Sequence, residues 1–292
     1  MQVKGTGVAL ITPFLAETHK IDYLSLEKIV NHCISGGLNY LVVLGTTAET
    51  PTLTHEEQLE IANVVREVTA NRLPLVIGAG GNNTQKIVDF LGSFDFKGYE
   101  AVLSANPSYN KPSQEGIYQH YKAIAQASPK PILLYNVPSR AASNINAQTV
   151  VRLANDFTNI VGIKEASGNF AQCADIYQNA PKGFALISGD DSATLPLCAL
   201  GAVGLISVLA NAYPAQVSQL VNECLNENYA AARTLHYALQ NMTTAIFEDG
   251  NPSGIKYLMH LHGLCQNELR LPLVPANHAT QTKIKNLTQD KK

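Results

Sequence analysis

Short apolar runs rich in β-branched residues recur along the chain, and segments with the apolar period of a helix separate them. The runs that we interpret as strands cover residues 7–11, 40–45, 73–80, 99–105, 131–137, 160–166, 185–189 and 204–208. Their starts lie about 19 to 33 residues apart, which leaves room for a helix after each strand. Eight strands alternating with helices predict an α/β fold of the (β/α)8 TIM barrel type. A doubly wound open sheet is the competing fold, but it usually has fewer strands, and no glycine-rich nucleotide loop follows the first run.

Polar residues mark where several helices are expected to begin. Residues 54–57, Thr-His-Glu-Glu, have the pattern of a capping box, in which two side chains bond the backbone amides of the first turn. Asp22, Thr84, Ser113 and Asn146 each stand before an apolar-periodic run, as N-cap residues do.

From about residue 228 the strand signal stops and helical patterns remain. Residues 229–247 form the first pattern, a second runs from 251 to 262, and a third covers about 277–288. An extended connector at 270–275 precedes the last one. We therefore expect a barrel domain at residues 1–227 and a small three-helix C-terminal domain at 228–292.

A lysine follows one of the most apolar predicted strands. Ile160, Val161 and Ile163 are typical of a strand buried on both faces, and Lys164 comes directly after them. Burying a lysine is costly unless its amine is paired or used. A desolvated amine loses its proton more easily, and a neutral amine on a rigid strand can attack a carbonyl to form a Schiff base. The alternative is a lysine that faces solvent or pairs with Glu165.

Further polar residues lie at the carboxyl ends of the predicted strands, where a barrel has its active site. They are Thr46 and Thr47 after the second strand, residues 106–110 after the fourth, Tyr135 and Arg140 at the fifth, residues 188–191 at the seventh and residues 206–207 at the eighth. Hydroxyls and free N–H groups suit a carboxylate, and the guanidinium fork of Arg140 can bind another. Each residue also has a structural alternative, since threonines can satisfy a turn and Tyr135 can be a core aromatic. Their convergence on one mouth with Lys164 favours catalysis.

Composition excludes several classes of protein. Of the 292 residues, 46% are hydrophobic and 15% charged, and the net charge is 21 − 23 = −2, so we do not expect nucleic acid as a partner. The five cysteines are widely spaced and indicate reduced core thiols. The first residues hold no apolar signal region, and prolines and glycines interrupt residues 195–212. We therefore expect a cytoplasmic protein without a membrane span.

Two further features narrow the ligand chemistry. Asp190 and Asp191 follow the seventh strand, where this fold often binds phosphate, and we expect their carboxylates to repel one. His260, His262 and Cys265 form a cluster of potential metal ligands, but positions 260 and 262 face apart on a helix. We therefore expect no metal and no cofactor, and a substrate with a carboxylate but no phosphate.

Several motifs resemble the dihydrodipicolinate synthase / N-acetylneuraminate lyase superfamily, and the resemblance extends over essentially the whole chain. They are GVALITPF at 7–14, GTTAE at 45–49, YNVPSR at 135–140, GIKEASG at 162–168, SGDD at 188–191, Asn-Pro at 251–252 and Arg-Leu-Pro-Leu at 270–273. The resemblance implies the barrel fold and a Schiff-base lysine at Lys164. Ala48 stands where the family usually has glycine, so we expect that turn to lose some freedom to adopt positive φ.

Within the superfamily, Thr46, Thr47, Tyr109 and Arg140 resemble the dihydrodipicolinate synthases. This resemblance implies an aldol-type condensation of pyruvate, bound to Lys164 as a Schiff base, with L-aspartate 4-semialdehyde. The product would be 4-hydroxy-tetrahydrodipicolinate, on the way to diaminopimelate and lysine. One alternative is a retro-aldol lyase for a 2-keto-3-deoxy acid or sialic acid, which typically lacks the arginine. Another is a catalytically silent barrel that binds a keto acid as a sensor.

The resemblance also implies roles for individual residues. Lys164 would attack the pyruvate ketone, and Tyr135 would move protons at the Schiff-base carbons, relayed through Thr47 to Tyr109. In the family the tyrosine that matches Tyr109 comes from the neighbouring subunit, which implies a homotetramer built as a dimer of dimers. The implied substrate contacts are Thr46 and Thr47 for the pyruvate carboxylate, Arg140 for the semialdehyde carboxylate, the Ile206 carbonyl near the lysine, and Gly189.

Some members of the family bind lysine as a feedback inhibitor at the dimer interface. The positions that match theirs are Thr50, Pro51, His55, Gln58, Asn82, Lys86 and Ser108. Sensitive members usually have a carboxylate where Lys86 stands, and many have a tyrosine at position 108. A slip of one residue in the turn at 80–83 would place Gln85 at the contact instead. We expect lysine to inhibit this protein weakly or not at all.

Overall fold

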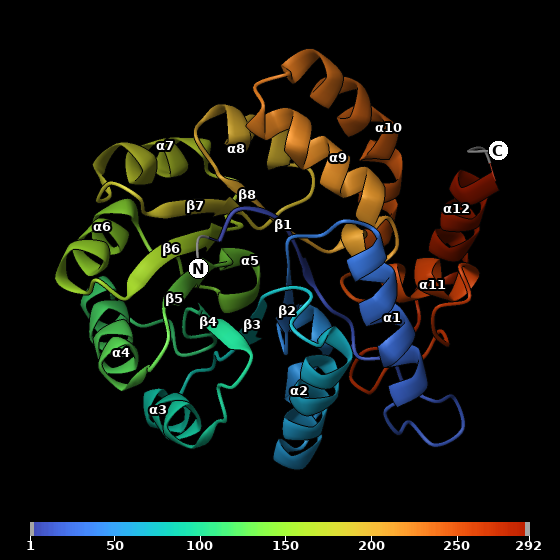
Figure 1. Cartoon of the computed structure of the whole chain (residues 1–292), viewed down its shortest axis with the longest axis horizontal. Helices are drawn as coiled ribbons and strands as arrows, with labels where there is room; N and C mark the ends of the chain where they lie inside the picture. Colours follow the sequence, from blue (N-terminus) through green and yellow to red (C-terminus); the bar gives the residue numbers. More distant parts are fainter. Residues whose placement is uncertain (1–2, 290–292) are drawn as a thin grey trace.

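Eight parallel strands close into a barrel in the order in which they occur along the chain (Figure 1). The structure is a computed structural model that describes residues 3–289. The strands are β1 Gly5–Ala9, β2 Tyr40–Val43, β3 Leu75–Gly78, β4 Tyr99–Ala105, β5 Ile132–Asn136, β6 Ile160–Glu165, β7 Ala185–Ser188 and β8 Gly204–Ser207. The pairing of β1 with β8 closes the barrel, so the predicted (β/α)8 TIM barrel is confirmed.

Alternate side chains of the strands fill two different apolar layers. Ala9, Val42 and Leu133 belong to the cluster inside the barrel, whereas their chain neighbours belong to the larger cluster between strands and helices. The strands are therefore buried on both faces, which explains why their sequences are apolar runs and not alternating patterns. Gly7 leaves space for the ring of Tyr40, because a Cβ atom at residue 7 would lie 2.2 Å from that ring.

The helices that follow the strands lie around the outside of the barrel, except the short helix Pro138–Ala141, which Figure 1 shows nearer the centre. They are α1 Tyr23–Ser35, α2 His55–Thr69, α3 Thr84–Ser93, α4 Gln114–Ala127, α5 Pro138–Ala141, α6 Ala147–Asp156, α7 Phe170–Asn179, α8 Thr194–Ala199 and α9 Pro214–Leu225. Short 3-10 turns, η1 Thr46–Ala48, η2 Thr50–Thr52 and η3 Leu209–Asn211, follow strands β2 and β8.

The predicted helix starts are correct at four of the five N-caps. Those confirmed are Asp22, Thr54, Ser113 and Asn146, each of which accepts a hydrogen bond from an amide in its first turn. The capping box is confirmed too, since Glu57 accepts a bond from the Thr54 amide. The prediction for α3 is wrong by one residue, because the side chain of Asn83 caps that helix and Thr84 begins it.

The predicted strand limits agree with the structure for β4 and are too long for most other strands. The first strand begins at Gly5, two residues earlier than predicted, because Gly5 pairs with Gly204 across the closure. It ends at Ala9, where the ladder with β2 stops. Sequence pattern cannot reveal this limit, because residues 10 and 11 remain apolar and buried after the pairing ends.

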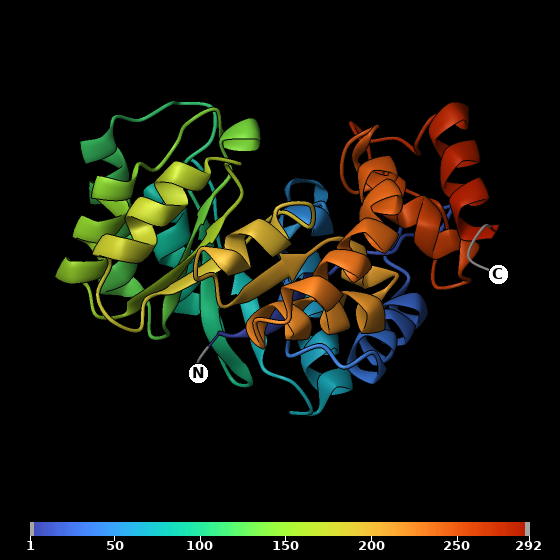
Figure 2. The same cartoon turned by 90° about the horizontal axis from the view of Figure 1, so that it is seen from above.

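Three helices follow the barrel and occupy the end of the molecule opposite α4 and α6 (Figures 1 and 2). They are α10 Tyr229–Phe247, α11 Ser253–Leu261 and α12 His278–Gln289, which confirms the predicted helical appendage. Helix α10 packs against α8 and α9, and α11 and α12 pack against α10. The division into two domains near residue 227 stays a prediction.

The structure also bears on the thiols and on membranes. Each of the five cysteines is buried and free, as the sequence predicted. Between residues 3 and 289, no helix combines the length and the apolar character needed to cross a membrane.

His120 of α4 is a buried base at the contact between two outer helices. Its Nδ1 atom lies 2.8 Å from the hydroxyl of Thr84 at the start of α3, and its Nε2 atom is buried without a hydrogen-bond partner. Burial lowers the pKa of His120 to about 4. The folded protein therefore holds a neutral imidazole under conditions in which the unfolded chain would bind a proton.

This leads to a prediction about acid stability. Between pH 6.5 and pH 4 the unfolded state binds more protons at His120 than the folded state, so the free energy of unfolding falls as the pH falls. Between pH 7 and pH 4.5 we expect His120 to account for a loss of about 2–3 kcal/mol. The variant His120→Gln keeps a hydrogen-bonding group but cannot titrate. In urea denaturation, its free energy of unfolding should fall by about 2–3 kcal/mol less between pH 7 and pH 4.5 than that of the natural protein. Equal losses in both proteins would contradict the prediction.

Candidate active site

Lys164 lies inside the barrel near the carboxyl end of β6. It is 4% exposed, and it pairs in register with Tyr135 on β5. Gly162, two residues earlier and thus on the same face, packs against the interior residue Leu133. The Lys164 amine lies 4.3 Å from the centre of the Tyr135 ring. The amine and the phenol are therefore neighbours at one end of the barrel interior.

The amine of Lys164 has no polar partner in the described part of the chain. No hydrogen bond or ion pair to it occurs among residues 3–289, and the amine lies over the Tyr135 ring. Glu165 is buried on the opposite face and accepts bonds from Asn136, Gln172 and the Ser167 amide. The alternatives of a solvent-facing lysine or a Lys164–Glu165 pair are thus wrong. The amine of a buried lysine, when it has no polar partner, is available for chemistry.

Gly189, at the end of β7, leaves the space that the lysine side chain occupies. A Cβ atom at residue 189 would lie 2.9 Å from Cε of Lys164 and 2.9 Å from Cβ of Ala166. Such contacts are too close for carbon atoms, so a larger residue would displace the lysine. Gly189 therefore gives the lysine room in this chain, and its predicted contact with a substrate stays a prediction.

Thr46 and Thr47 lie in the 3-10 turn η1 directly after β2. No side chain caps the start of η1, so the amides of its first residues have no partner inside the turn. The Thr12 hydroxyl donates to the Ala48 carbonyl at 2.8 Å and holds the turn against the segment that follows β1. The expectation that Ala48 restricts this turn is wrong, because the left-handed residues are Leu44 and Glu49 on either side.

A buried ion pair joins this turn to the C-terminal helices. The amine of Lys256 on α11 contacts the carboxylate of Glu49, and both side chains are fully buried. The amine also donates to the Glu268 carbonyl at 2.8 Å, and the Arg270 amide donates to Glu49 at 3.0 Å. Burial lowers the pKa of Lys256, and the Glu49 charge opposes that shift. Sequence pattern missed this pair because its members are 207 residues apart.

Asn251, between α10 and α11, contacts two of the predicted site residues. Its side-chain Nδ2 donates to Oγ1 of Thr47 at 2.9 Å in a buried contact. Its backbone carbonyl accepts from Nη2 of Arg140 at 3.2 Å. The structure thus brings Thr47 and Arg140 together through a residue that the sequence did not mark for chemistry.

The predicted proton relay is not assembled within one chain. No hydrogen bond among residues 3–289 joins Thr47, Tyr135 and Tyr109 to one another. Tyr109 is 87% exposed and has a positive φ of 71°, which is unusual for a residue other than glycine. Tyr109 therefore presents its ring to the outside of this chain.

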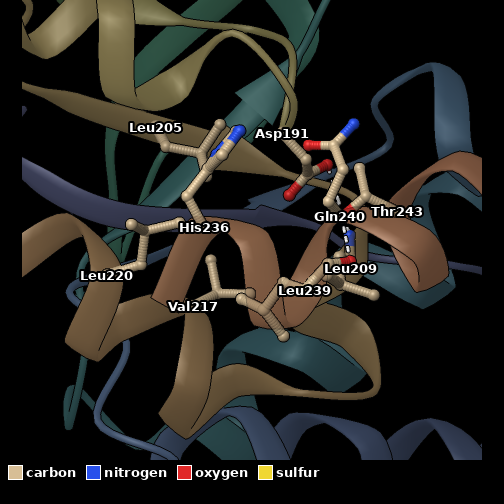
Figure 3. Close-up of a pocket in the computed structure, with 9 residues that line it drawn as sticks. All are labelled: Asp191, Leu205, Leu209, Val217, Leu220, His236, Leu239, Gln240 and Thr243. Atoms are coloured by element: carbon tan, nitrogen blue, oxygen red, sulfur yellow. Dashed lines mark hydrogen bonds between the residues drawn. The ribbon is translucent and has the colours of Figure 1, made fainter. Parts of the chain in front are cut away.

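Asp191 does not face the mouth of the barrel, so the argument that its charge repels phosphate there is wrong. Its carboxylate accepts from the Ser207 hydroxyl and from the Val208 amide at 2.9 Å, on the outer side of β8. Burial raises the pKa of Asp191, and these bonds oppose that shift. Figure 3 shows the carboxylate beside a small cavity lined by α9 and α10. Ile206, one residue before Ser207, belongs instead to the cluster inside the barrel.

The positions that match a lysine-binding site lie in the segments that follow β2, β3 and β4, including the first turns of α2 and α3. They are Thr50, Pro51, His55, Gln58, Asn82, Lys86 and Ser108. The Thr50 hydroxyl donates to the Gly45 carbonyl, and Gln58 donates to the Leu53 carbonyl, so both side chains have partners. Lys86 is exposed in the first turn of α3, and Gln85 donates to Asp89 along the same helix. Regulation by lysine stays a prediction.

Comparison with known proteins gives one family. The sequence profile of the Dihydrodipicolinate synthetase family matches residues 2–291. A 4-hydroxy-tetrahydrodipicolinate synthase of Parabacteroides distasonis is 50% identical over 287 residues, covering 98% of this chain and 96% of that protein.

Two solved structures are similar over nearly their whole length. The dihydrodipicolinate synthase of Acinetobacter baumannii, solved as a chloride-inhibited form in complex with pyruvate, has a TM-score of 0.95 and 37% identity, covering 99% of this chain and 98% of that one. A structure described as the first monomeric dihydrodipicolinate synthase variant has a TM-score of 0.95 and 36% identity, and the match covers 98% of this chain and 96% of that one.

The close approach of Gly189 to the Lys164 side chain leads to a prediction about the reactivity of the lysine. Gly189→Ala should lower the rate at which borohydride traps a keto acid on Lys164 by roughly tenfold to a hundredfold, because small displacements of a reacting group have effects of that size. The control is Gly92→Ala on α3, where a Cβ atom meets nothing within 4 Å. An unchanged rate in Gly189→Ala, with the control also unchanged, would contradict the role of this glycine.

Proposed function

Because the chain belongs to the dihydrodipicolinate synthetase family, we propose that it catalyses the 4-hydroxy-tetrahydrodipicolinate synthase reaction with Lys164 as its nucleophile. In this reaction pyruvate condenses with L-aspartate 4-semialdehyde, in the biosynthesis of diaminopimelate and lysine. The enzyme is a Schiff-base-forming carbon–carbon lyase. The observation that carries the proposed role of Lys164 is that this buried lysine has an amine with no polar partner among residues 3–289.

The chemistry begins with that amine. Nζ of Lys164 attacks the ketone carbon of pyruvate, water leaves, and the resulting iminium draws electrons from the neighbouring methyl group. Loss of a methyl proton then gives an enamine, whose terminal carbon attacks the aldehyde of the second substrate. Tyr135, whose ring lies beside the amine, would move protons at these carbons. This mechanism requires neither a metal nor a cofactor.

Two carboxylates must be held while this happens. The uncapped turn η1 offers amides and the hydroxyls of Thr46 and Thr47 to the carboxylate of pyruvate. Arg140 lies in α5, shortly after β5, and can bind the carboxylate of the semialdehyde through its guanidinium fork. The Ile206 carbonyl completes the substrate contacts near the lysine, as the family resemblance implies. Two anion-binding groups around one amine suit two acidic substrates.

The alternatives fit these features less well. A retro-aldol lyase for a keto-deoxy acid or sialic acid would share Lys164 and Tyr135, but the relatives carry the synthase name and Arg140 is present. A sensor that merely binds a keto acid would not require a buried amine without a partner, which is costly to maintain.

We propose that Tyr109 serves the active site of a neighbouring subunit in a homotetramer built as a dimer of dimers. Tyr109 is exposed, has a left-handed backbone, and its side chain makes no hydrogen bond to any residue between 3 and 289, which supports this role. One similar structure is described as a monomeric variant, so assembly varies in the family. Sedimentation at assay concentration tests the proposal, and a fully active species of 31.5 kDa would contradict it.

We place the reaction in the cytoplasm. Five buried free thiols suit a reducing compartment, and the substrates are those of amino-acid biosynthesis. Fractionation of cells that produce the protein would test this, and recovery outside the soluble intracellular fraction would contradict it.

The proposed function predicts the behaviour of Lys164→Ala. With pyruvate and the semialdehyde in a coupled assay, the natural protein should turn over and the variant should be slower by several orders of magnitude, because it cannot form the covalent intermediate. The melting temperature of the variant serves as the control for folding. Near-normal turnover in a folded variant would refute the Schiff-base mechanism, and an inactive natural protein would refute the synthase activity.

Arg140→Ala should mainly raise the KM for the semialdehyde. A charged hydrogen bond contributes about 1.5–3 kcal/mol, so the expected rise is about tenfold or more. The KM for pyruvate should change little, because Thr46 and Thr47 are intact. Steady-state kinetics with each substrate varied in turn gives both constants. An unchanged KM for the semialdehyde would leave Arg140 with a structural role.

Lysine should inhibit this enzyme weakly or not at all. At the matching positions Lys86 presents a cation to the ammonium of the ligand, and Ser108 cannot stack as a tyrosine would. We expect affinity at least a hundredfold weaker than in a sensitive enzyme, or on the order of 3 kcal/mol. Titration of lysine into the steady-state assay measures this, with Lys86→Glu as the matched variant that should gain sensitivity. Half-inhibition of the natural protein below a millimolar would contradict the prediction.

A further inference from the structure

The C-terminal appendage supplies one buried side chain to the proposed active site. Asn251 is 8% exposed and lies between α10 and α11, yet its amide donates to the hydroxyl of Thr47, 204 residues earlier in the chain. Its backbone carbonyl holds Arg140. Asn251 therefore contacts two residues of the proposed site. One is Thr47, proposed to bind the pyruvate carboxylate and to relay protons, and the other is Arg140, proposed to bind the semialdehyde.

The buried ion pair keeps this contact in register. Lys256 on α11 and Glu49 after η1 connect the same two segments that Asn251 and Thr47 connect. Breaking such a pair leaves an uncompensated buried charge, so these segments resist moving apart. The hydroxyl of Ser253 further ties the start of α11 to the Val274 carbonyl at 2.8 Å. The amide of Asn251 is thus held at a fixed place beside Thr47.

The contact also sets what the Thr47 hydroxyl can do. A hydroxyl has one hydrogen to donate and two lone pairs. Asn251 occupies one lone pair of Thr47, and no residue between 3 and 289 accepts the Thr47 hydrogen. The hydrogen of Thr47 is therefore free to be donated toward the reacting groups.

The amide is retained although part of it is unsatisfied. Oδ1 of Asn251 is buried without a hydrogen-bond partner, which is costly in a protein interior. If the amide were turned over, Oδ1 would accept the hydrogen of Thr47 and remove it from any relay. Packing alone does not explain a buried amide in this orientation, whereas a donor for Thr47 does.

We propose that Asn251 is a positioning residue of the active site, which acts by donating to Thr47 so that the Thr47 hydroxyl donates its own hydrogen into the proton relay. The inference rests on the proposed synthase function and deepens it. It makes the appendage part of the catalytic apparatus, because no residue of the barrel supplies this donor in the described structure.

The test isolates proton movement from the second substrate. In D2O with pyruvate alone, enamine formation exchanges the methyl hydrogens of pyruvate for deuterium, which proton NMR follows. Asn251→Ala removes the amide but keeps the backbone carbonyl that holds Arg140. Asn251→Asp keeps the shape but can only accept a bond while it is ionised, so it captures the Thr47 hydrogen. Both variants should exchange at least tenfold more slowly, and Asn251→Ala should keep the KM for the semialdehyde within about twofold.

Two comparisons separate positioning from a general structural effect. In a Thr47→Val background, Asn251→Ala should cause no further slowing, since Asn251 acts through Thr47. Asn155→Ala, which removes an exposed asparagine bonded within its own helix, should exchange at the natural rate. Melting temperatures report whether each variant is folded.

The outcomes are distinct. Natural exchange rates in folded Asn251→Ala and Asn251→Asp would overturn the inference, and so would a full additional loss in the Thr47→Val background. Failure of both Asn251 variants to fold would assign this residue a purely structural role and would also overturn it. If the natural protein itself exchanges no hydrogens, the proposed function fails instead.

Discussion

Closure of the barrel is the constraint on which the site depends. Pairing of β1 with β8 turns alternate residues of every strand into an enclosed interior, and on β6 the alternation points Lys164 inward and Glu165 outward. The same register places Tyr135 beside the lysine. Gly189 leaves the space through which the lysine side chain extends. The side chain of Lys164 is therefore largely enclosed, and its amine makes no hydrogen bond or ion pair among residues 3–289.

Two buried lysines show how environment separates structure from chemistry. Lys256 is completely enclosed, but Glu49 and a backbone carbonyl satisfy its amine, so it joins the appendage to the barrel. Lys164 is nearly as buried and has no such partner in the described structure. The first arrangement fixes the turn that carries Thr47. The second leaves an unpaired amine, which we propose as the nucleophile. Removal of the Lys256 charge would leave Glu49 buried without its partner, whereas removal of the Lys164 amine would break no ion pair among residues 3–289.

Local pattern predicted most of the fold but not the contacts that complete the site. The limits of β4 and α10 and the capping box at Thr54 follow from residues close together in sequence, and they agree with the structure. The role of Asn251 depends on a partner 204 residues away, which no periodicity reveals. The expectation that the Asp191 carboxylate faces the mouth of the barrel was wrong. A loop residue lacks the alternating pattern that shows which way a strand side chain points.

Reductive trapping of the intermediate would show which lysine forms the Schiff base. The protein is incubated with pyruvate and borohydride, digested, and its peptides are weighed by mass spectrometry. We expect a reduced pyruvate adduct on Lys164 and none on Lys256, because the Lys256 amine is already paired with Glu49. An adduct confined to any other lysine, or no adduct at saturating pyruvate, would contradict this expectation.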